Sequence, residues 1–69
     1  MSEYLSVEGI GSNRQKALAH ADIQAMTYFD LDLIKLDRTI FRGRAKVIPF
    51  SGPVKVFSLD VEYRVKGQL

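Results

Sequence analysis

Residues 57–66, FSLDVEYRVK, alternate apolar and polar side chains without interruption. Successive side chains of a β-strand point to opposite faces of a sheet, so this alternation predicts a strand over residues 54–66. A strand with one apolar and one polar face is typical of an antiparallel sheet that is covered on one side and solvated on the other. The positions predicted to face the core are Phe57, Leu59, Val61, Tyr63 and Val65.

Residues 13–28 carry the pattern of an α-helix, with apolar residues at helical spacing. The apolar face gathers Ala17, Leu18, Ala21, Ala25, Tyr28 and Phe29, and the polar face Lys16, His20, Gln24 and Thr27. A second apolar arc consists of Ala19, Ile23 and Met26. An ordinary surface helix has one apolar stripe, so we expect this second arc to lie in an interface between copies of the chain.

A short strand is predicted before the helix, over residues 4–8. Gly9 and Gly11 are expected to end it, because glycine tolerates backbone angles that other residues resist. Ser12 or Asn13 then caps the helix through a side-chain oxygen. The glycine pair lacks the further glycine or lysine of a nucleotide-binding loop, so we interpret it as a turn.

The segment after the helix is predicted to form one or two strands. Residues 30–37 have a strand-like composition, and residues 39–48 alternate more clearly, with a turn or bulge at Asp37-Arg38. The alternation places Ile40, Arg42, Arg44, Lys46 and Ile48 on one face, opposite Phe41, Gly43, Ala45 and Val47. Residues 49–53, PFSGP, give the strongest turn signal in the chain.

This order predicts an α+β fold in which one α-helix packs on a small antiparallel β-sheet, in the order β-α-β-β(-β). The 69 residues make one domain, 1–69. A chain of this length buries only about 60% of the surface that its unfolded form exposes. The sequence has no cysteine, which excludes disulfides and thiolate metal sites. We therefore expect self-association to complete the burial, giving a homo-oligomer that uses Ala19, Ile23 and Met26 or an open sheet edge.

Several function classes are disfavoured. No apolar run approaches the roughly 20 residues of a membrane helix, and the amino terminus lacks the pattern of a secretory signal, so a cytoplasmic setting is expected. His20 is interpreted as an ordinary surface residue, because no nucleophile motif or orienting acid accompanies it. The acids Asp30, Asp32 and Asp37 lack the spacing of a calcium loop. We expect neither enzymatic activity nor a bound metal.

Basic residues gather between Lys35 and Lys46, where Asp37 is the one acid. Such a strand can bind a phosphate backbone, and the neighbouring Phe41 can stack on a base. The alternative is a solvated strand face, which Asp60 and Glu62 would neutralise by pairing across the sheet. The candidate contacts for nucleic acid are Arg14, Lys16, Arg38, Arg42, Arg44 and Lys46.

The opening YLSVEGIGSN resembles the first strand and turn of the dodecin family, and GPVKVFSLDVEYRV resembles its last strand. The resemblance extends over nearly the whole chain and implies a strand-helix-strand-strand fold. Members of that family assemble as hollow dodecamers and bind flavins between aromatic rings. Their stacking tryptophan lies on the second strand, whereas this sequence has no tryptophan. Phe29 and Phe41 are the nearest rings, so flavin is a cofactor that the resemblance alone implies.

A second resemblance is to the double-stranded-RNA-binding domain. GIGSNRQKALAHADIQAM resembles its last strand and helix, with Arg14 and Lys16 where phosphate contacts would fall, and SGPVKVF resembles its Gly-Pro loop. In that family the loop precedes the helix, so the order is reversed here. A third hypothesis is a small inhibitor that docks onto a protein partner by lending it a sheet edge.

Overall fold

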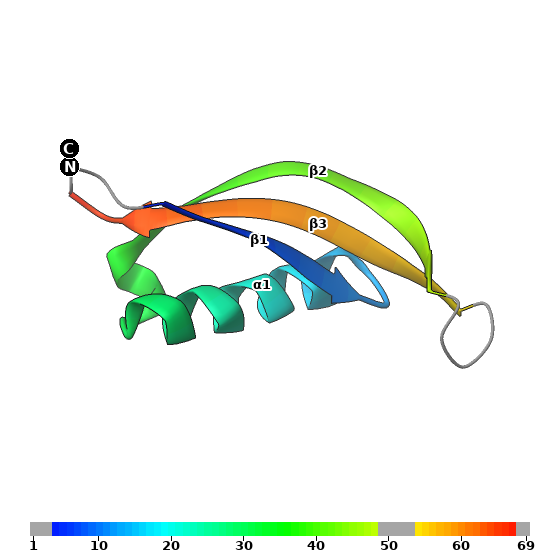
Figure 1. Ribbon diagram of the computed structural model, residues 1–69, viewed down its shortest axis with the longest axis horizontal. Coiled ribbons are helices and arrows are strands. Elements are labelled where there is room, and N and C mark those ends of the chain that lie inside the picture. Colours follow the sequence, from blue (N-terminus) through cyan, green and yellow to red (C-terminus); the bar gives the residue numbers. More distant parts are fainter. Residues whose placement is uncertain (1–3, 49–53, 68–69) are drawn as a thin grey trace.

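The computed structural model describes residues 4–48 and 54–67 of the chain. In chain order its elements are β1 (Tyr4–Gly11), α1 (Arg14–Phe29), the 3-10 helix η1 (Leu33–Lys35), β2 (Leu36–Ile48) and β3 (Val54–Val65). The strands form one antiparallel sheet in the order β1-β3-β2, and α1 lies along one face of it (Figure 1). The predicted α+β fold is confirmed, whereas the predicted PFSGP turn falls outside the described residues.

The last strand, β3, lies at the centre of the sheet and has the alternating pattern predicted for it. Leu59, Val61 and Tyr63 are fully buried between the sheet and α1. Each is flanked on both sides, since Val61 for example lies opposite Val7 of β1 and Ile40 of β2. By strand alternation the other side chains of β3 point to the opposite face, which no described helix covers (Figure 1).

Small residues let α1 lie close to the sheet. Ala17, Ala21 and Ala25 are fully buried on the helix face that meets the strands. A Cβ atom on Gly9 would overlap the carbonyl oxygen of Ala17, and one on Gly11 would lie 2.6 Å from the backbone nitrogen of Ala17. Neither glycine has a positive φ, and β1 continues through both of them. The predicted turn is therefore wrong, because these glycines provide space for the helix instead of special backbone angles.

Both ends of α1 are capped. The side chain of Asn13, in an extended backbone conformation, accepts a hydrogen bond from the N–H of Lys16 at 2.9 Å, which satisfies one free amide of the first turn. At the other end Asp30 adopts the left-handed conformation (φ 55°), and its N–H donates to the carbonyl of Met26. The helix predicted over residues 13–28 is confirmed to within one residue.

The strand predicted from residue 30 is wrong over its first six residues. Asp30 turns the chain, and Leu33–Lys35 then form η1 before β2 begins at Leu36. The apolar side chains of this stretch serve another purpose, since Leu31 and Leu33 fold back to pack against the core. An apolar composition therefore marked a core-covering connection here and not a strand.

A β-bulge divides β2 between Ile40 and Gly43, further along than the predicted position at Asp37-Arg38. Before the bulge, Ile40 lies opposite Val61 and packs against the core. After it, Gly43 lies opposite Leu59, so the residues facing the helix side change from even to odd numbers. An extra residue shifts every following side chain to the other face. The predicted grouping of Ile40 with the basic side chains is therefore wrong.

Candidate interaction surface

The sheet has two edge strands, β1 and β2, and the outer backbone groups of each are left unpaired by β3. In an antiparallel strand, alternate residues hydrogen-bond to opposite sides. Glu8 and Ile10 of β1 form hydrogen bonds outward to α1, so the backbone groups of the odd-numbered residues of β1 face β3. The odd-numbered residues of β3 therefore hydrogen-bond to β1, and the even-numbered residues of β3 hydrogen-bond to β2. The outward-facing backbone groups of β2 are those of Leu36, Arg38, Ile40, Gly43, Ala45 and Val47.

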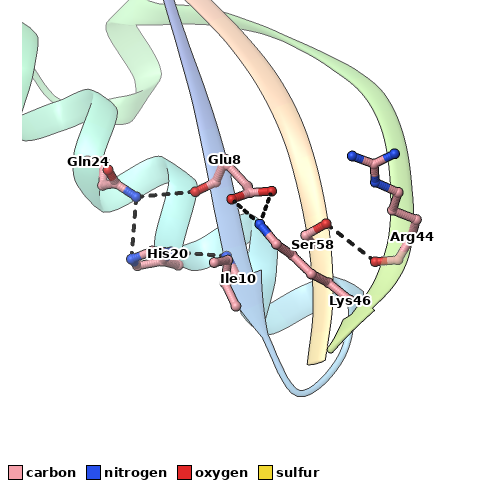
Figure 2. Close-up of polar contacts among 7 residues, drawn as sticks. All are labelled: Glu8, Ile10, His20, Gln24, Arg44, Lys46 and Ser58. Atoms are coloured by element: carbon pink, nitrogen blue, oxygen red, sulfur yellow. Dashed lines mark hydrogen bonds and ion pairs between the residues drawn. The ribbon is translucent and has the colours of Figure 1, made fainter. Parts of the chain in front are cut away.

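Two side chains of α1 cover the outer edge of β1 at Glu8 and Ile10 (Figure 2). Nδ1 of His20 accepts a hydrogen bond from the N–H of Ile10 at 3.1 Å. The amide nitrogen of Gln24 donates to the carbonyl of Glu8 at 3.4 Å. Because His20 and Gln24 are one helical turn apart, they reach two neighbouring outward groups of the same strand. We call these two side chains the β1 clamp.

The clamp corrects the interpretation of His20 as an ordinary surface residue. Its ring is exposed, but it is the acceptor for a strand amide that would otherwise face solvent. Neutral imidazole has one acceptor nitrogen, so the Nε2 atom carries the proton and faces the Gln24 nitrogen at 3.3 Å. Two donors meet there, so the backbone contacts, and not the contact between the two side chains, hold the clamp. A doubly protonated ring would have no acceptor for Ile10.

An ion pair spans the uncovered face of the sheet. Nζ of Lys46, on β2, lies 3.1 Å from both carboxylate oxygens of Glu8, on β1 (Figure 2). Ser58 occupies the position between them on β3 and is only 3% exposed. Its hydroxyl donates to the carbonyl of Arg44 at 3.4 Å. The pair therefore links the two outer strands across the middle one and engages one of the predicted anion contacts.

A second polar cluster ties the helix to the sheet from the inside. Asp22 of α1 accepts a hydrogen bond from the hydroxyl of Tyr63 at 2.5 Å and one from the guanidinium of Arg38 at 2.8 Å. Asp22 thereby links three elements, since it belongs to α1, Tyr63 to β3 and Arg38 to β2. Burial of the ring and the hydrogen bond to Asp22 raise the pKa of the Tyr63 phenol. A buried carboxylate that accepts from a neutral hydroxyl and a charged guanidinium is a structural link, and the ion pair removes Arg38 from the set of free cations.

The structure does not gather the six predicted basic contacts on one surface. Arg38 faces the helix side and Lys46 is paired with Glu8, whereas Arg44 is exposed on the uncovered face. Arg42 is exposed at the bulge, and the side chains of Arg14 and Lys16 are exposed in the first turn of α1. In the described part of the chain the ion-paired acids are Asp22, Glu8 and Asp37, so the predicted neutralisation by Asp60 and Glu62 is not seen there.

The outer edge of β2 differs from that of β1. Beyond the bulge, no other described segment hydrogen-bonds to the outward backbone groups of Ala45 and Val47. The side chains of Phe41 and Val47 are more than half exposed, at 55% and 59%. Figure 1 shows β2 and β3 extending past the end of β1 and away from α1. This edge is therefore long, partly apolar and open.

The other predicted contact residues are placed as follows. Of the predicted interface arc, Ala19 and Ile23 are exposed, whereas Met26 is half-buried against the core. Of the predicted ligand-stacking rings, Phe29 is half-buried in the core with its ring 5.0 Å from that of Tyr28, and Phe41 is exposed at the bulge. A cavity of about 280 Å³ lies at the end of α1, and its lining includes neither ring.

The single chain leaves more surface in water than a compact monomer of its size. Its accessible surface is 5014 Å², whereas a monomeric protein of the same mass exposes about 4,400 Å². Its radius of gyration is 13.1 Å, against about 11 Å for a compact domain of equal length. The difference has a visible cause, since three of the seven buried apolar residues are alanines and the β2–β3 ribbon extends beyond the helix.

Comparison with protein-family models, curated proteins and solved structures finds no significant match to this chain. The described residues include no group of three or more His, Asp or Glu side chains placed to hold a metal ion. None of the described helices is both long enough and apolar enough to cross a membrane.

Proposed function

We propose that this protein is a non-enzymatic, self-assembling domain whose copies pair through the open outer edge of β2. The observation that carries this proposal is the contrast between β1, where His20 and Gln24 engage two outward groups, and the 13-residue edge strand β2, whose outward groups beyond the bulge no other described segment engages. An exposed strand of this length presents a row of backbone donors and acceptors to another strand. The resemblance of the sequence to dodecins, which are assemblies, points in the same direction.

The exposed surface supports the same proposal. The chain exposes about 600 Å² more than a compact monomer of its mass, which is of the same order as the roughly 800 Å² that each partner buries in a standard interface. Phe41 and Val47 place apolar area directly on the open edge. Pairing there would combine backbone hydrogen bonds with apolar burial, and a second copy of the chain is the partner that is always available.

The test is the molar mass in solution, measured by size-exclusion chromatography with light scattering. We expect a multiple of the 7.8 kDa chain mass. Ala45→Pro should lower the mass, because the N–H of Ala45 points outward and its loss leaves the ladder with β3 intact. Ala45→Ser is the matched control, since it changes the side chain and keeps the N–H. A monomeric wild type at high concentration, or equal masses for both folded variants, would exclude assembly through this edge.

A second candidate function is nucleic-acid binding, favoured by the exposed Arg42 and Arg44, which form no ion pair within the described residues. The dependence on salt concentration distinguishes nucleic-acid binding from self-assembly. Binding to a phosphate backbone weakens steeply as salt is raised, whereas pairing of two net-basic strands strengthens as their repulsion is screened. Titration of labelled duplex RNA at two salt concentrations, with Arg42→Ala/Arg44→Ala as the variant, measures the first, and light scattering measures the second.

Flavin binding follows from the resemblance to dodecins. Phe41 is the exposed ring and is the better candidate of the two, because Phe29 packs in the core. Quenching of riboflavin fluorescence by the wild type, and its loss in Phe41→Ala, would support a ligand-binding assembly. Unchanged fluorescence would leave assembly without this ligand.

A further inference from the structure

We infer that the β1 clamp is a specificity device, in which His20 and Gln24 restrict edge pairing to β2 against β2 of a second copy and so produce a closed twofold pair. This inference rests on the proposed self-assembly and adds a geometry to it. The clamp residues act on assembly indirectly, because they contact the edge that must not pair and not the edge that pairs.

A sheet with two open edges can grow without limit. If β1 were free, β2 of one copy could pair with β1 of the next, and each added copy would again present one free edge of each kind. Such head-to-tail contacts do not close unless the rotation between copies forms a ring, and otherwise they generate filaments. A soluble assembly built on β2 therefore needs a device that closes β1.

The clamp closes β1 in two ways. It engages the N–H of Ile10 and the carbonyl of Glu8, which are two of the outward groups that an added strand would use. It also occupies space, because the added strand would have to lie roughly 4.8 Å from β1 in the plane of the sheet. The His20 ring, in hydrogen-bond contact with Ile10, already stands there (Figure 2).

With β1 closed, the edge that remains is β2. A strand that pairs with its own copy forms an isologous contact, in which both copies use the same surface and the pair is complete. The charges on β2 set the strength of this contact, since the basic side chains of two antiparallel copies come near one another; these are Arg42, Arg44 and Lys46. Lys46 is already compensated by Glu8 of its own chain, so the two arginines account for most of the repulsion.

The experiment opens the clamp in the full chain. His20→Ala/Gln24→Ala removes both contacts, and Lys16→Ala, one turn earlier on the same polar face of α1, is the matched control. The amide exchange rate of Ile10, measured by NMR, should rise at least about tenfold in the clamp variant, and not in the control. The mass should change from a closed value to one that grows continuously with concentration. Adding Ala45→Pro should stop that growth.

The outcomes separate the inference from the proposed function. A wild type that assembles, with a clamp variant of the same closed mass, overturns the clamp inference and leaves the proposed function standing. A monomeric wild type overturns both the proposed function and the closed pair, even where the clamp variant grows into long assemblies. If both stay monomeric, or if Ile10 exchanges equally fast in wild type and variant, the clamp inference fails. Should the double variant unfold, His20→Ala alone and the acceptor-retaining His20→Gln give the same comparison.

Discussion

The two edges of this sheet have the same chemistry and opposite surroundings. Each presents a row of backbone N–H and C=O groups, yet two outer groups of β1, at Glu8 and Ile10, meet Gln24 and His20, whereas those of β2 beyond the bulge meet no other described segment. The difference arises from where the helix lies. The short connection after Gly11 folds α1 back beside β1, while β2 leaves the helix behind (Figure 1). An edge is therefore protected or available according to its distance from one helix.

The largest effect is expected where the helix meets β1. Gly9→Val should destabilise the fold by about 3 kcal/mol or more, because the new side chain would overlap the backbone of Ala17 and push α1, with its clamp, away from the strand. Denaturant unfolding followed by circular dichroism measures this. Ser6→Val is the control, since Ser6 is an exposed residue of the same strand. Equal stabilities would show that close helix packing does not hold this edge.

The next effect concerns the polar cluster that holds the helix to β2 and β3. Tyr63→Phe should cost about 1–3 kcal/mol, because it leaves one oxygen of the buried Asp22 without its donor. Tyr4→Phe, at a tyrosine that is 54% exposed, should have little effect. Unfolding free energies of the two variants test this, and a Tyr63→Phe protein as stable as wild type would contradict the assigned role of the cluster.

The same cluster predicts a loss of stability in alkali. Burial, and after it the hydrogen bond to Asp22, raise the pKa of the Tyr63 phenol from its ordinary value of 10.0. The neutral phenol thus contributes stability that is complete below pH 10 and is lost as the pH rises through the higher folded value. The unfolding free energy of the wild type should fall above pH 10 more steeply than that of Tyr63→Phe. Parallel curves for the two proteins would argue against it.

The smallest effect is expected from the ion pair that links the two edges. Glu8 and Lys46 are partly exposed, at 36% and 44% of their side chains, so solvent screens their attraction. A double-mutant cycle with Glu8→Gln and Lys46→Met should give a coupling below about 1 kcal/mol, which decreases in high salt. A larger coupling would mean that the pair, and not the shared strand β3, holds β1 and β2 in register.

Much of the architecture could be predicted from the sequence, because local patterns determine it. The alternation around Val61 predicted the last strand and its buried face, although not its central place in the sheet, and the spacing of Ala17, Ala21 and Ala25 predicted the helix and its contact side. The order of elements then defined the α+β class. These features depend on periodicity within one segment, which a sequence displays directly.

The features that define the edges could not be predicted in the same way. The partner of His20 is a backbone amide ten residues earlier, and no side-chain pattern marks it. The bulge is located by the pairing of β2 with β3, so alternation within β2 alone assigned Ile40 to the wrong face. Asp22 was a polar interruption between two apolar arcs, and only the fold revealed that Tyr63 and Arg38 converge on it. Each of these depends on contacts between segments.

The bulge also makes the facing of the β2 side chains depend on the number of residues in the strand and not only on which residues they are. Because of its extra residue, even-numbered residues of β2 face the helix side before the bulge and odd-numbered residues face it after the bulge. Removing one residue at position 41 or 42 would remove the bulge, and Gly43 and the residues after it would keep their partners on β3, with Arg44 and Lys46 on the uncovered face and Ala45 on the helix side. Removing both would place Gly43 opposite Asp60 instead of Leu59, which would turn Arg44 and Lys46 toward the helix and Ala45 away from it. The number of residues at the bulge therefore decides which face the later side chains of β2 occupy, and substitutions do not change that number.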